Sequence, residues 1–158
     1  VSFGNLLIKQ VVSVLQAEHP RLKRFVTLSP IPGLRLWLET EGLEFLHRFE
    51  SSDDETALKS IVAQYLTSGH GAKLKDPVAR FHLGNGATLE QINAGADLSS
   101  RGQQQSFGFM VNYLYELDDI VRNHEQLMES GQIATSKDVQ QLLNKTRKHQ
   151  LKELSHDA

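Results

Sequence analysis

Apolar side chains recur at helical spacing near the amino terminus. Val11 follows Leu7 by four residues, and Val14 and Leu15 follow Val11 by three and four. This spacing predicts a helix over residues 5 to 18, since side chains three and four apart share one helical face. Gly4-Asn5 suits an amino-terminal turn and cap. His19-Pro20 predicts the end of the helix, because the residue before a proline avoids the α region.

A short strand is predicted directly after this helix. Residues 24 to 29, RFVTLS, are mostly apolar or β-branched, as in a buried strand. A helix that leads into a strand is half of an α/β crossover unit. The chain starts at Val1 within a helical pattern and without an initiator methionine. We therefore expect an earlier segment, which would supply the other strands of the sheet.

Caps and breakers predict the later elements. Residues 34 to 49 are expected to be helical with a break at Gly42, and residues 53 to 67 to form an amphipathic helix capped by Asp53 or Asp54. Asp76 and Pro77 begin a short helix that ends at residues 84 to 86, GNG. The remaining predictions are strands at 88 to 93 and within 106 to 117, a polar connection at 95 to 106, and two charged helices over 117 to 154 with a break at Gly131.

Composition limits the classes of protein that fit. The 158 residues are 39% apolar, enough for one domain with a core. The net charge of -2 gives no reason to expect nucleic acid or an anionic membrane as a partner. The chain has no cysteine, which excludes disulfides, thiolate nucleophiles and cysteine metal ligands. No apolar run is long enough to span a membrane and no signal peptide opens the chain, so we expect a cytoplasmic location.

Ser29 is the first candidate for chemistry. A hydroxyl at the end of a buried strand lies where α/β sheets open their ligand crevice. Pro30 and Pro32 stiffen the loop that follows, as a positioned group requires. The commoner role of a serine before a proline is to cap a turn. The residues alone leave both interpretations open.

His82 is the second candidate. It shares a helical face with Val78 and is flanked by Phe81 and Leu83. An imidazole in partly apolar surroundings can titrate near neutrality and transfer a proton. The alternative is a core histidine whose ring nitrogens are satisfied locally. The other histidines lie in polar contexts, and none pairs with another at metal-ligand spacing beside a carboxylate, so we expect no metal site.

A third and weaker candidate is the turn at Gly4-Asn5. Free backbone N–H groups at the start of a helix suit a phosphate, although an ordinary helix cap has the same sequence.

Four strings occur together in this chain: FVTLSPIPGLRLWL, DPVARFHLGNGATLEQIN, GFMVNYLY and NHE. In this order they resemble malonyl-CoA decarboxylase over nearly the whole chain. The joint occurrence of SPIPG and FHLGNGA at this separation carries the resemblance, which is strongest over residues 24 to 38 and 76 to 115. The chain departs from the family at Ala94-Gly95, where the family usually has a tryptophan and a bulky apolar residue. We expect looser local packing there.

The resemblance implies a fold and a set of site residues. The implied fold is of α/β (α+β) class, the carboxy-terminal portion of an acetyltransferase-like (GNAT) catalytic domain over residues 1–116, with residues 117–158 as its helical tail. The family's catalytic serine and histidine fall on Ser29 and His82. The end of the family's coenzyme A loop falls on Val1, Ser2, Phe3, Gly4 and Asn5.

The implied reaction converts malonyl-CoA to acetyl-CoA and carbon dioxide. Coenzyme A is part of the substrate, and no metal or other cofactor is needed. A positioned hydroxyl suits charge stabilisation, and a histidine with a pKa of about 7 suits proton donation. We therefore expect Ser29 to orient the malonyl group and His82 to protonate the enolate, whereas the family's description makes the serine a proton acceptor. We also expect a homo-oligomer for the full-length enzyme.

Two other functions fit the same sequence. An acyl-CoA N-acyltransferase of the same fold would transfer the acyl group to an amine. A truncated, non-catalytic module would only bind coenzyme A or a protein partner. Carbon dioxide release from malonyl-CoA without an amine excludes the first, and a longer reading frame upstream of Val1 argues against the second. The carboxy-terminal residues SHDA lack a peroxisomal Ser-Lys-Leu address, which favours a bacterial-type cytoplasmic enzyme.

Overall fold

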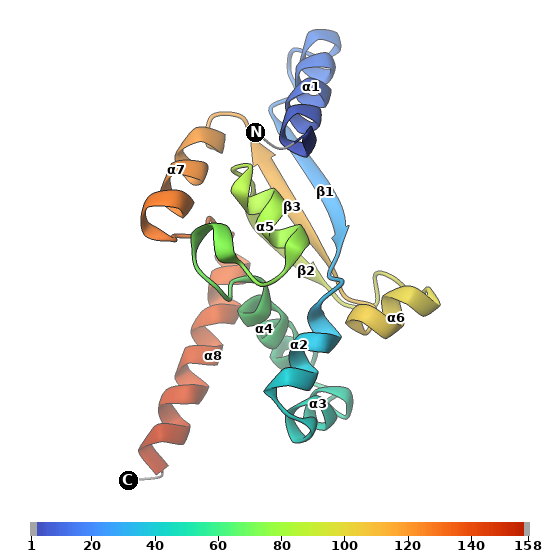
Figure 1. The fold of residues 1–158 in the computed structure, drawn as a ribbon, viewed down its shortest axis with the longest axis vertical. Helices are drawn as coiled ribbons and strands as arrows, with labels where there is room; N and C mark the ends of the chain where they lie inside the picture. The colour runs from blue at the N-terminus through green and yellow to red at the C-terminus, as the bar shows by residue number, and fades with distance from the viewer. Residues whose placement is uncertain (1–2, 157–158) are drawn as a thin grey trace.

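A three-stranded sheet lies at the centre of the fold (Figure 1). The computed structural model describes the backbone of residues 3–156 and the side chains of residues 7–146 except Ala72. Its strands are β1 (Arg24–Pro30), β2 (Thr88–Asn93) and β3 (Met110–Glu116), in the order β1-β3-β2. Both pairings are antiparallel. The predicted mixture of helices and strands is confirmed. A ligand crevice was expected at Ser29 because α/β crossover sheets open one at the ends of their strands. That expectation does not apply to an antiparallel sheet.

The register of the sheet decides which side chains lie together. In β1 and β3, Ser29 is paired with Val111 and Thr27 with Tyr113. On the other side of β3, Ile92 is also opposite Val111, and the register shifts between Leu89 and Gln91. Since paired residues point to the same face, Ser29, Thr27 and Tyr113 share one face of the sheet.

Helices surround this sheet. They are α1 (Phe3–Glu18), α2 (Leu34–Glu41), α3 (Leu43–Glu50), α4 (Glu55–Leu66), the short 3-10 helix η1 (Gly71–Lys73), α5 (Pro77–Gly84), α6 (Ser100–Ser106), α7 (Ile120–Ser130) and α8 (Lys137–His156). In Figure 1, α5 crosses in front of the sheet, and α1 and α8 extend toward opposite ends of the molecule. The core includes Val62 and Leu66 of α4 and Val111 of β3, which are fully buried.

Local chemistry explains where several helices begin and end. The Asp54 side chain accepts a hydrogen bond from the Ala57 N–H at 3.0 Å and caps α4. Asp76 caps α5 in the same way, with Pro77 in its first turn. Gly42 separates α2 from α3, and Gly131 ends α7 with a φ of 71°. These boundaries confirm the predictions made from caps and breakers.

Other predictions were wrong. Helix α1 begins at Phe3, so Gly4 and Asn5 lie inside the helix and not in a turn before it. The polar connection predicted at 95 to 106 contains α6, which is capped by the Ser99 side chain through the Gly102 N–H. The strand expected within 106 to 117 is confirmed as β3, although it begins only at Met110, because Phe107 and Gly108 adopt positive φ.

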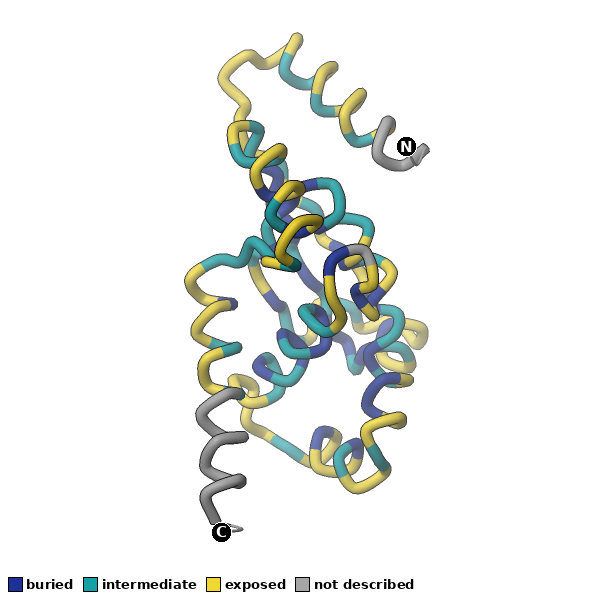
Figure 2. The backbone as a smooth tube through the Cα atoms, turned by 60° about the vertical axis from the view of Figure 1, so that its left-hand side comes forward, coloured by how far each residue is buried: buried dark blue, intermediate teal, exposed yellow. Residues whose placement is uncertain are grey.

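β1 is an edge strand and was wrongly predicted to be buried. Its side chains alternate, and Val26 and Leu28 on the outer face are 58% and 56% exposed. Within residues 3–156 the strand is paired on one side only, with β3. Figure 2 shows exposed positions along β1 and α1, and no residue of α1 between residues 7 and 18 is buried. An apolar strand with an open edge can pair with another chain.

We expect residues 1–158, produced alone, to self-associate through this strand. Replacing Val26 and Leu28 together by lysine places two charges on its outer face and should shift the protein toward a 17.8 kDa monomer in sedimentation experiments. Lysine at Val121, which is exposed on α7, is the matched control and should leave association unchanged. A wild-type protein that stays monomeric at high concentration would contradict this expectation.

Candidate functional site

Ser29 and His82 are in direct contact. The Ser29 Oγ lies 3.2 Å from the His82 Nε2, within hydrogen-bond distance, although 53 positions separate the two residues in the sequence. Ser29 is buried with 5% of its surface exposed, and His82 is half-buried. The structure therefore brings together the two side chains that the sequence singled out for chemistry.

Each of the two side chains is held by its own element. Ser29 is the penultimate residue of β1, and the Thr27 Oγ1, two positions earlier on the same face, lies 3.0 Å from its Oγ. His82 is in the last turn of α5, and Asp76 fixes the first turn of that helix. The contact thus joins the end of a strand to the end of a capped helix.

The far side of the imidazole is occupied by β3. The Tyr115 hydroxyl lies 2.7 Å from the His82 Nδ1. The Tyr113 ring is stacked on the imidazole, with ring centroids 4.5 Å apart and an angle of 19° between the planes. Phe81 meets the imidazole edge-on at 5.1 Å. Both ring nitrogens of His82 therefore have hydroxyl partners, and its orientation is fixed.

Burial controls the protonation of this cluster. Desolvation lowers the pKa of His82 from 6.5 to about 4, so the imidazole is neutral at pH 7. The pKa expected from the sequence, about 7, is too high, because it did not include the burial that the packing of α5 on β3 imposes. Burial also raises the pKa of Tyr115, whose hydroxyl keeps its proton at neutral pH.

The other candidates lie outside this contact. Val1 and Ser2 are outside the described residues, while Phe3, Gly4 and Asn5 form the first turn of α1. Asn112 of β3 donates from Nδ2 to the Thr27 carbonyl at 3.1 Å and so stabilises the strand pairing. Gly95 is exposed, and a Cβ added there would meet nothing within 4 Å. The small residue at that position therefore leaves no buried void.

Tyr115 and Thr27 are site residues that the sequence did not reveal. Both are recognisable only through the register, because Thr27 is opposite Tyr113 while Tyr115 is two residues further along the same strand. The alternating string YLY, residues 113 to 115, is the one local sign, since it places two tyrosines on one face of a strand.

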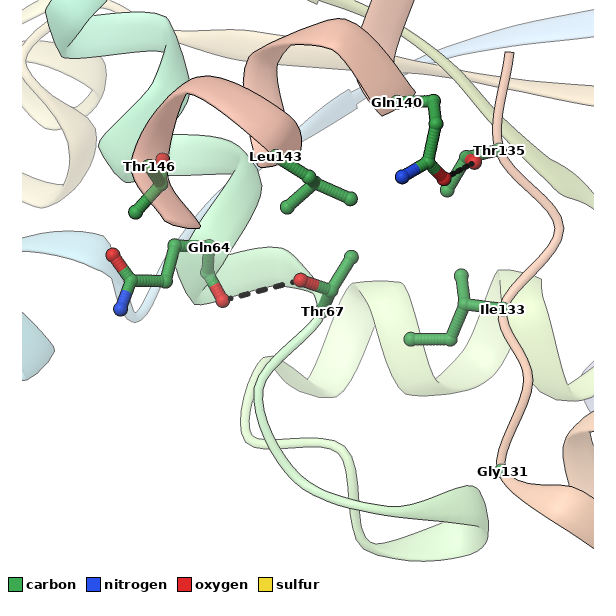
Figure 3. Close-up of a pocket in the computed structure, with 8 residues that line it drawn as sticks. All are labelled: Gln64, Thr67, Gly131, Ile133, Thr135, Gln140, Leu143 and Thr146. Carbon is green, nitrogen blue, oxygen red and sulfur yellow. Dashed lines mark hydrogen bonds between the residues drawn. The ribbon is translucent and has the colours of Figure 1, made fainter. Parts of the chain in front are cut away.

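Among the cavities lined by described residues, two lie away from this contact. One of about 410 Å³ borders the serine loop at Pro32 and Gly33. The other, of about 340 Å³, lies between α4, α8 and the segment before α8 (Figure 3). Hydroxyl, amide and apolar groups without charge line the second one, from Gln64, Thr67, Gly131, Ile133, Thr135, Gln140, Leu143 and Thr146. Neither Ser29 nor His82 lines either cavity.

Metal and membrane features are absent from the part of the chain that is described. Among those residues, no three His, Asp or Glu side chains gather as metal ligands would. In the same part of the chain, no helix combines the length and apolarity needed to cross a bilayer.

Comparison with known proteins gives consistent similarities. A family model described as "Malonyl-CoA decarboxylase C-terminal domain" matches residues 1–57 and 47–153. The mitochondrial malonyl-CoA decarboxylase of Anser anser anser is 34% identical over 180 residues, covering 88% of this chain and 36% of its own length. That of Rattus norvegicus is 32% identical over 184 residues, covering 90% and 37%.

Solved structures give the same picture. Malonyl-CoA decarboxylase from Cupriavidus metallidurans has a TM-score of 0.75 at 40% identity, over 90% of this chain and 44% of that one. The enzyme from Agrobacterium vitis has a TM-score of 0.78 at 41% identity, over 89% and 40%. The chain thus spans less than half the length of each of these relatives. The two animal relatives are named as mitochondrial, and the cytoplasmic location of this chain stays a prediction.

The low pKa of His82 predicts a specific loss of stability in acid. The unfolded histidine titrates near 6.5 and the folded one near 4, so its neutral form stabilises the fold above pH 6.5 and this contribution is lost as the pH falls toward 4. We expect a loss of the order of 1–3 kcal/mol between pH 7 and pH 4.5. Urea unfolding of wild type and His82→Gln at both pH values measures it. An equal loss of stability in the two proteins would show that His82 is not the group responsible.

Proposed function

The chain belongs to the malonyl-CoA decarboxylase family, and we propose that Ser29 and His82 are the catalytic pair with which the protein converts malonyl-CoA to acetyl-CoA and carbon dioxide. The 3.2 Å contact between the Ser29 Oγ and the His82 Nε2 carries the proposal, because it joins the SPIPG and FHL segments on which the resemblance rests. We assign the described residues to the carboxy-terminal part of a GNAT-like catalytic domain on the strength of the same resemblance.

The reaction breaks the bond between the carboxylate carbon and the α-carbon of the malonyl group. Carbon dioxide leaves, and the electron pair passes into the α-carbon and the thioester carbonyl as an enolate. The thioester itself accepts these electrons, so the chemistry requires no metal and no organic cofactor. The enzyme must stabilise the developing oxygen charge and deliver one proton to the α-carbon.

Ser29 is suited to the first task. Its hydroxyl is buried and held by Thr27 on one side and His82 on the other, so it needs little reorganisation to donate a hydrogen bond to the thioester oxygen. A donor held in place by the protein stabilises charge better than one that must be ordered during the reaction.

His82 is suited to the second task through the charge of the substrate. Without substrate its imidazole is neutral at pH 7, because burial holds its pKa at about 4. A malonyl carboxylate bound beside the ring favours the imidazolium and raises this pKa, so a proton is taken up from solvent on binding. Decarboxylation releases neutral carbon dioxide and leaves the negative charge on the enolate. The imidazolium then gives its Nε2 proton to the α-carbon of the enolate, which neutralises both charges and returns the imidazole to its neutral form.

The coenzyme A end of the substrate is assigned to the start of α1. The proposal retains the residues implied by the family, Val1, Ser2, Phe3, Gly4 and Asn5. The last three form the first turn of α1, where backbone N–H groups lack helical partners and suit a phosphate. An N-acyltransferase of the same fold would use these features too, but it would release no carbon dioxide from malonyl-CoA alone.

Replacement of either catalytic side chain tests the assignment. In the full-length protein, Ser29→Ala and His82→Ala should each lower kcat for carbon dioxide release by about 100- to 10,000-fold, since positioned proton transfer and oxyanion donors contribute that much. The KM for malonyl-CoA should change little, because coenzyme A supplies most of the contacts. His47→Ala, at an exposed histidine of α3, is the matched control. Full activity in both catalytic variants would overturn the proposal.

A pair of tyrosine variants tests the support of His82. Tyr115→Phe removes the hydroxyl 2.7 Å from Nδ1 and should lower kcat by about tenfold, because a hydrogen bond to a charged group contributes roughly 1.5–3 kcal/mol. Tyr113→Phe keeps the stacked ring and removes a buried hydroxyl that has no hydrogen-bond partner among the described residues, so kcat should stay within about twofold. Equal effects of the two substitutions would show that the hydroxyl of Tyr115 has no special role.

A further inference from the structure

Asp76 is a fully buried carboxyl group immediately before α5, the helix that carries His82. It has no exposed surface, and it belongs to neither element that carries the pair's side chains. Buried carboxyl groups are unfavourable unless their oxygens are hydrogen-bonded. The partners of Asp76 therefore indicate what the group holds together.

One carboxylate oxygen caps α5, the histidine helix, which carries His82. The Asp76 Oδ1 accepts hydrogen bonds from the Val78 N–H at 3.0 Å and the Ala79 N–H at 2.8 Å. These are the free donors in the first turn of α5, which ends at Gly84, just beyond His82. The orientation of the helix, and with it the placement of the imidazole, depends on this cap.

The other carboxylate oxygen faces segments outside α5. The Asp76 Oδ2 accepts a hydrogen bond from the Tyr65 hydroxyl of α4 at 3.1 Å. The Gly33 N–H also interacts favourably with the charged form of this carboxyl group. Gly33 closes the loop SPIPG that begins with Ser29, so the carboxyl group reaches the serine side of the pair as well.

The approach of these groups is close enough to require a glycine. A Cβ at Gly33 would collide with the Tyr65 hydroxyl and lie 3.8 Å from the Asp76 Oδ2. Tyr65 is itself fixed by stacking on Trp37, with ring centroids 5.1 Å apart. The loop after Ser29 is thus held against α4 and α5 at one point.

We propose that Asp76 is a positioning residue that links the SPIPG loop to the histidine helix and so sets the distance between Ser29 and His82. It does not touch the reacting atoms. One oxygen caps α5 and the other accepts a hydrogen bond from Tyr65, whose hydroxyl lies against Gly33, so the serine loop and the helix that carries His82 meet at the same buried group. This inference rests on the proposed function, because positioning has a catalytic meaning only if the pair is catalytic.

Asp54 provides a comparison within the same chain. It caps α4 through the Ala57 N–H, but it is exposed and its side chain holds no second segment in the described structure. If capping alone were the role of Asp76, equivalent substitutions at the two positions would have equivalent effects.

The experiment separates capping from linking in the full-length protein. Serine remains a good helix cap but has only one side-chain oxygen, so Asp76→Ser keeps α5 capped and loses the contacts to Tyr65 and Gly33. We expect kcat for malonyl-CoA decarboxylation to fall by about 10- to 100-fold in Asp76→Ser with KM within about threefold, since a misplacement of about 1 Å costs that much. Asp54→Ser is the matched control and should leave kcat unchanged.

Two further variants complete the test. Asp76→Asn keeps a cap and a second polar atom in the same place. Its kcat should stay within about threefold of the wild-type value. Tyr65→Phe removes one hydrogen bond without disturbing the cap, and should lower kcat by about threefold to tenfold. Wild-type kcat in both Asp76→Ser and Tyr65→Phe would overturn the link, whether or not α5 is destabilised.

A second measurement keeps this inference separate from the proposed function. In protein labelled with ¹⁵N-histidine, the His82 ring signals should move in Asp76→Ser and Tyr65→Phe, while those of His47 should not. This readout does not depend on turnover. If Ser29→Ala and His82→Ala kept full activity, the proposed function would fail, and unchanged His82 signals in the Asp76 variant would separately overturn the link.

Discussion

The antiparallel pairing of β1 with β3 is the constraint on which the candidate site depends. Its register sets Thr27 opposite Tyr113 and Ser29 opposite Val111, so that the serine, its threonine neighbour and the tyrosines of β3 share one face. Helix α5 packs on that face and brings the imidazole of His82 between the serine and Tyr115. A slip of one residue would turn Ser29 to the outer face, where Val26 and Leu28 are exposed.

The same packing sets the electrostatics of the site. Stacking of His82 on Tyr113 and burial of Tyr115 exclude water from the imidazole, which lowers the pKa of His82 and raises that of Tyr115. The imidazole is therefore neutral at pH 7. On our proposal, the substrate carboxylate favours protonation of His82, and the proton then passes to the enolate that keeps the negative charge when carbon dioxide leaves.

The sequence could predict the features that local chemistry determines. The caps at Asp54 and Asp76 and the breaks at Gly42 and Gly131 each depend on a few adjacent residues, and the structure confirms them. Helix α6 was missed because its polar residues show no apolar stripe. The antiparallel strand order could not be predicted, since it depends on contacts between segments far apart in the chain.

In the candidate site too, some features follow from the local sequence and others depend on contacts between distant segments. Ser29 and His82 were candidates from their local sequence, the resemblance implied that they act as a pair, and the structure adds the distance between them. Tyr115 and Thr27 could not be found, because only the strand register brings them to the pair. The pKa of His82 was predicted wrongly for a related reason. Flanking residues in the sequence do not reveal how deeply the packing of α5 on β3 buries the ring.

The Ser29–His82 pair and helix α1 differ in how deeply they are buried among the described residues. The Thr27 and Tyr115 hydroxyls contact the Ser29–His82 pair, and the buried ring of Tyr113 is stacked on the imidazole. Helix α1, to which we assign the coenzyme A end of the substrate, has no buried residue between residues 7 and 18. Catalytic groups need placement within a fraction of an ångström, whereas a long ligand can be held by contacts spread over its length. The described packing is therefore tighter around Ser29 and His82 than along α1, as a catalytic role for the pair would require.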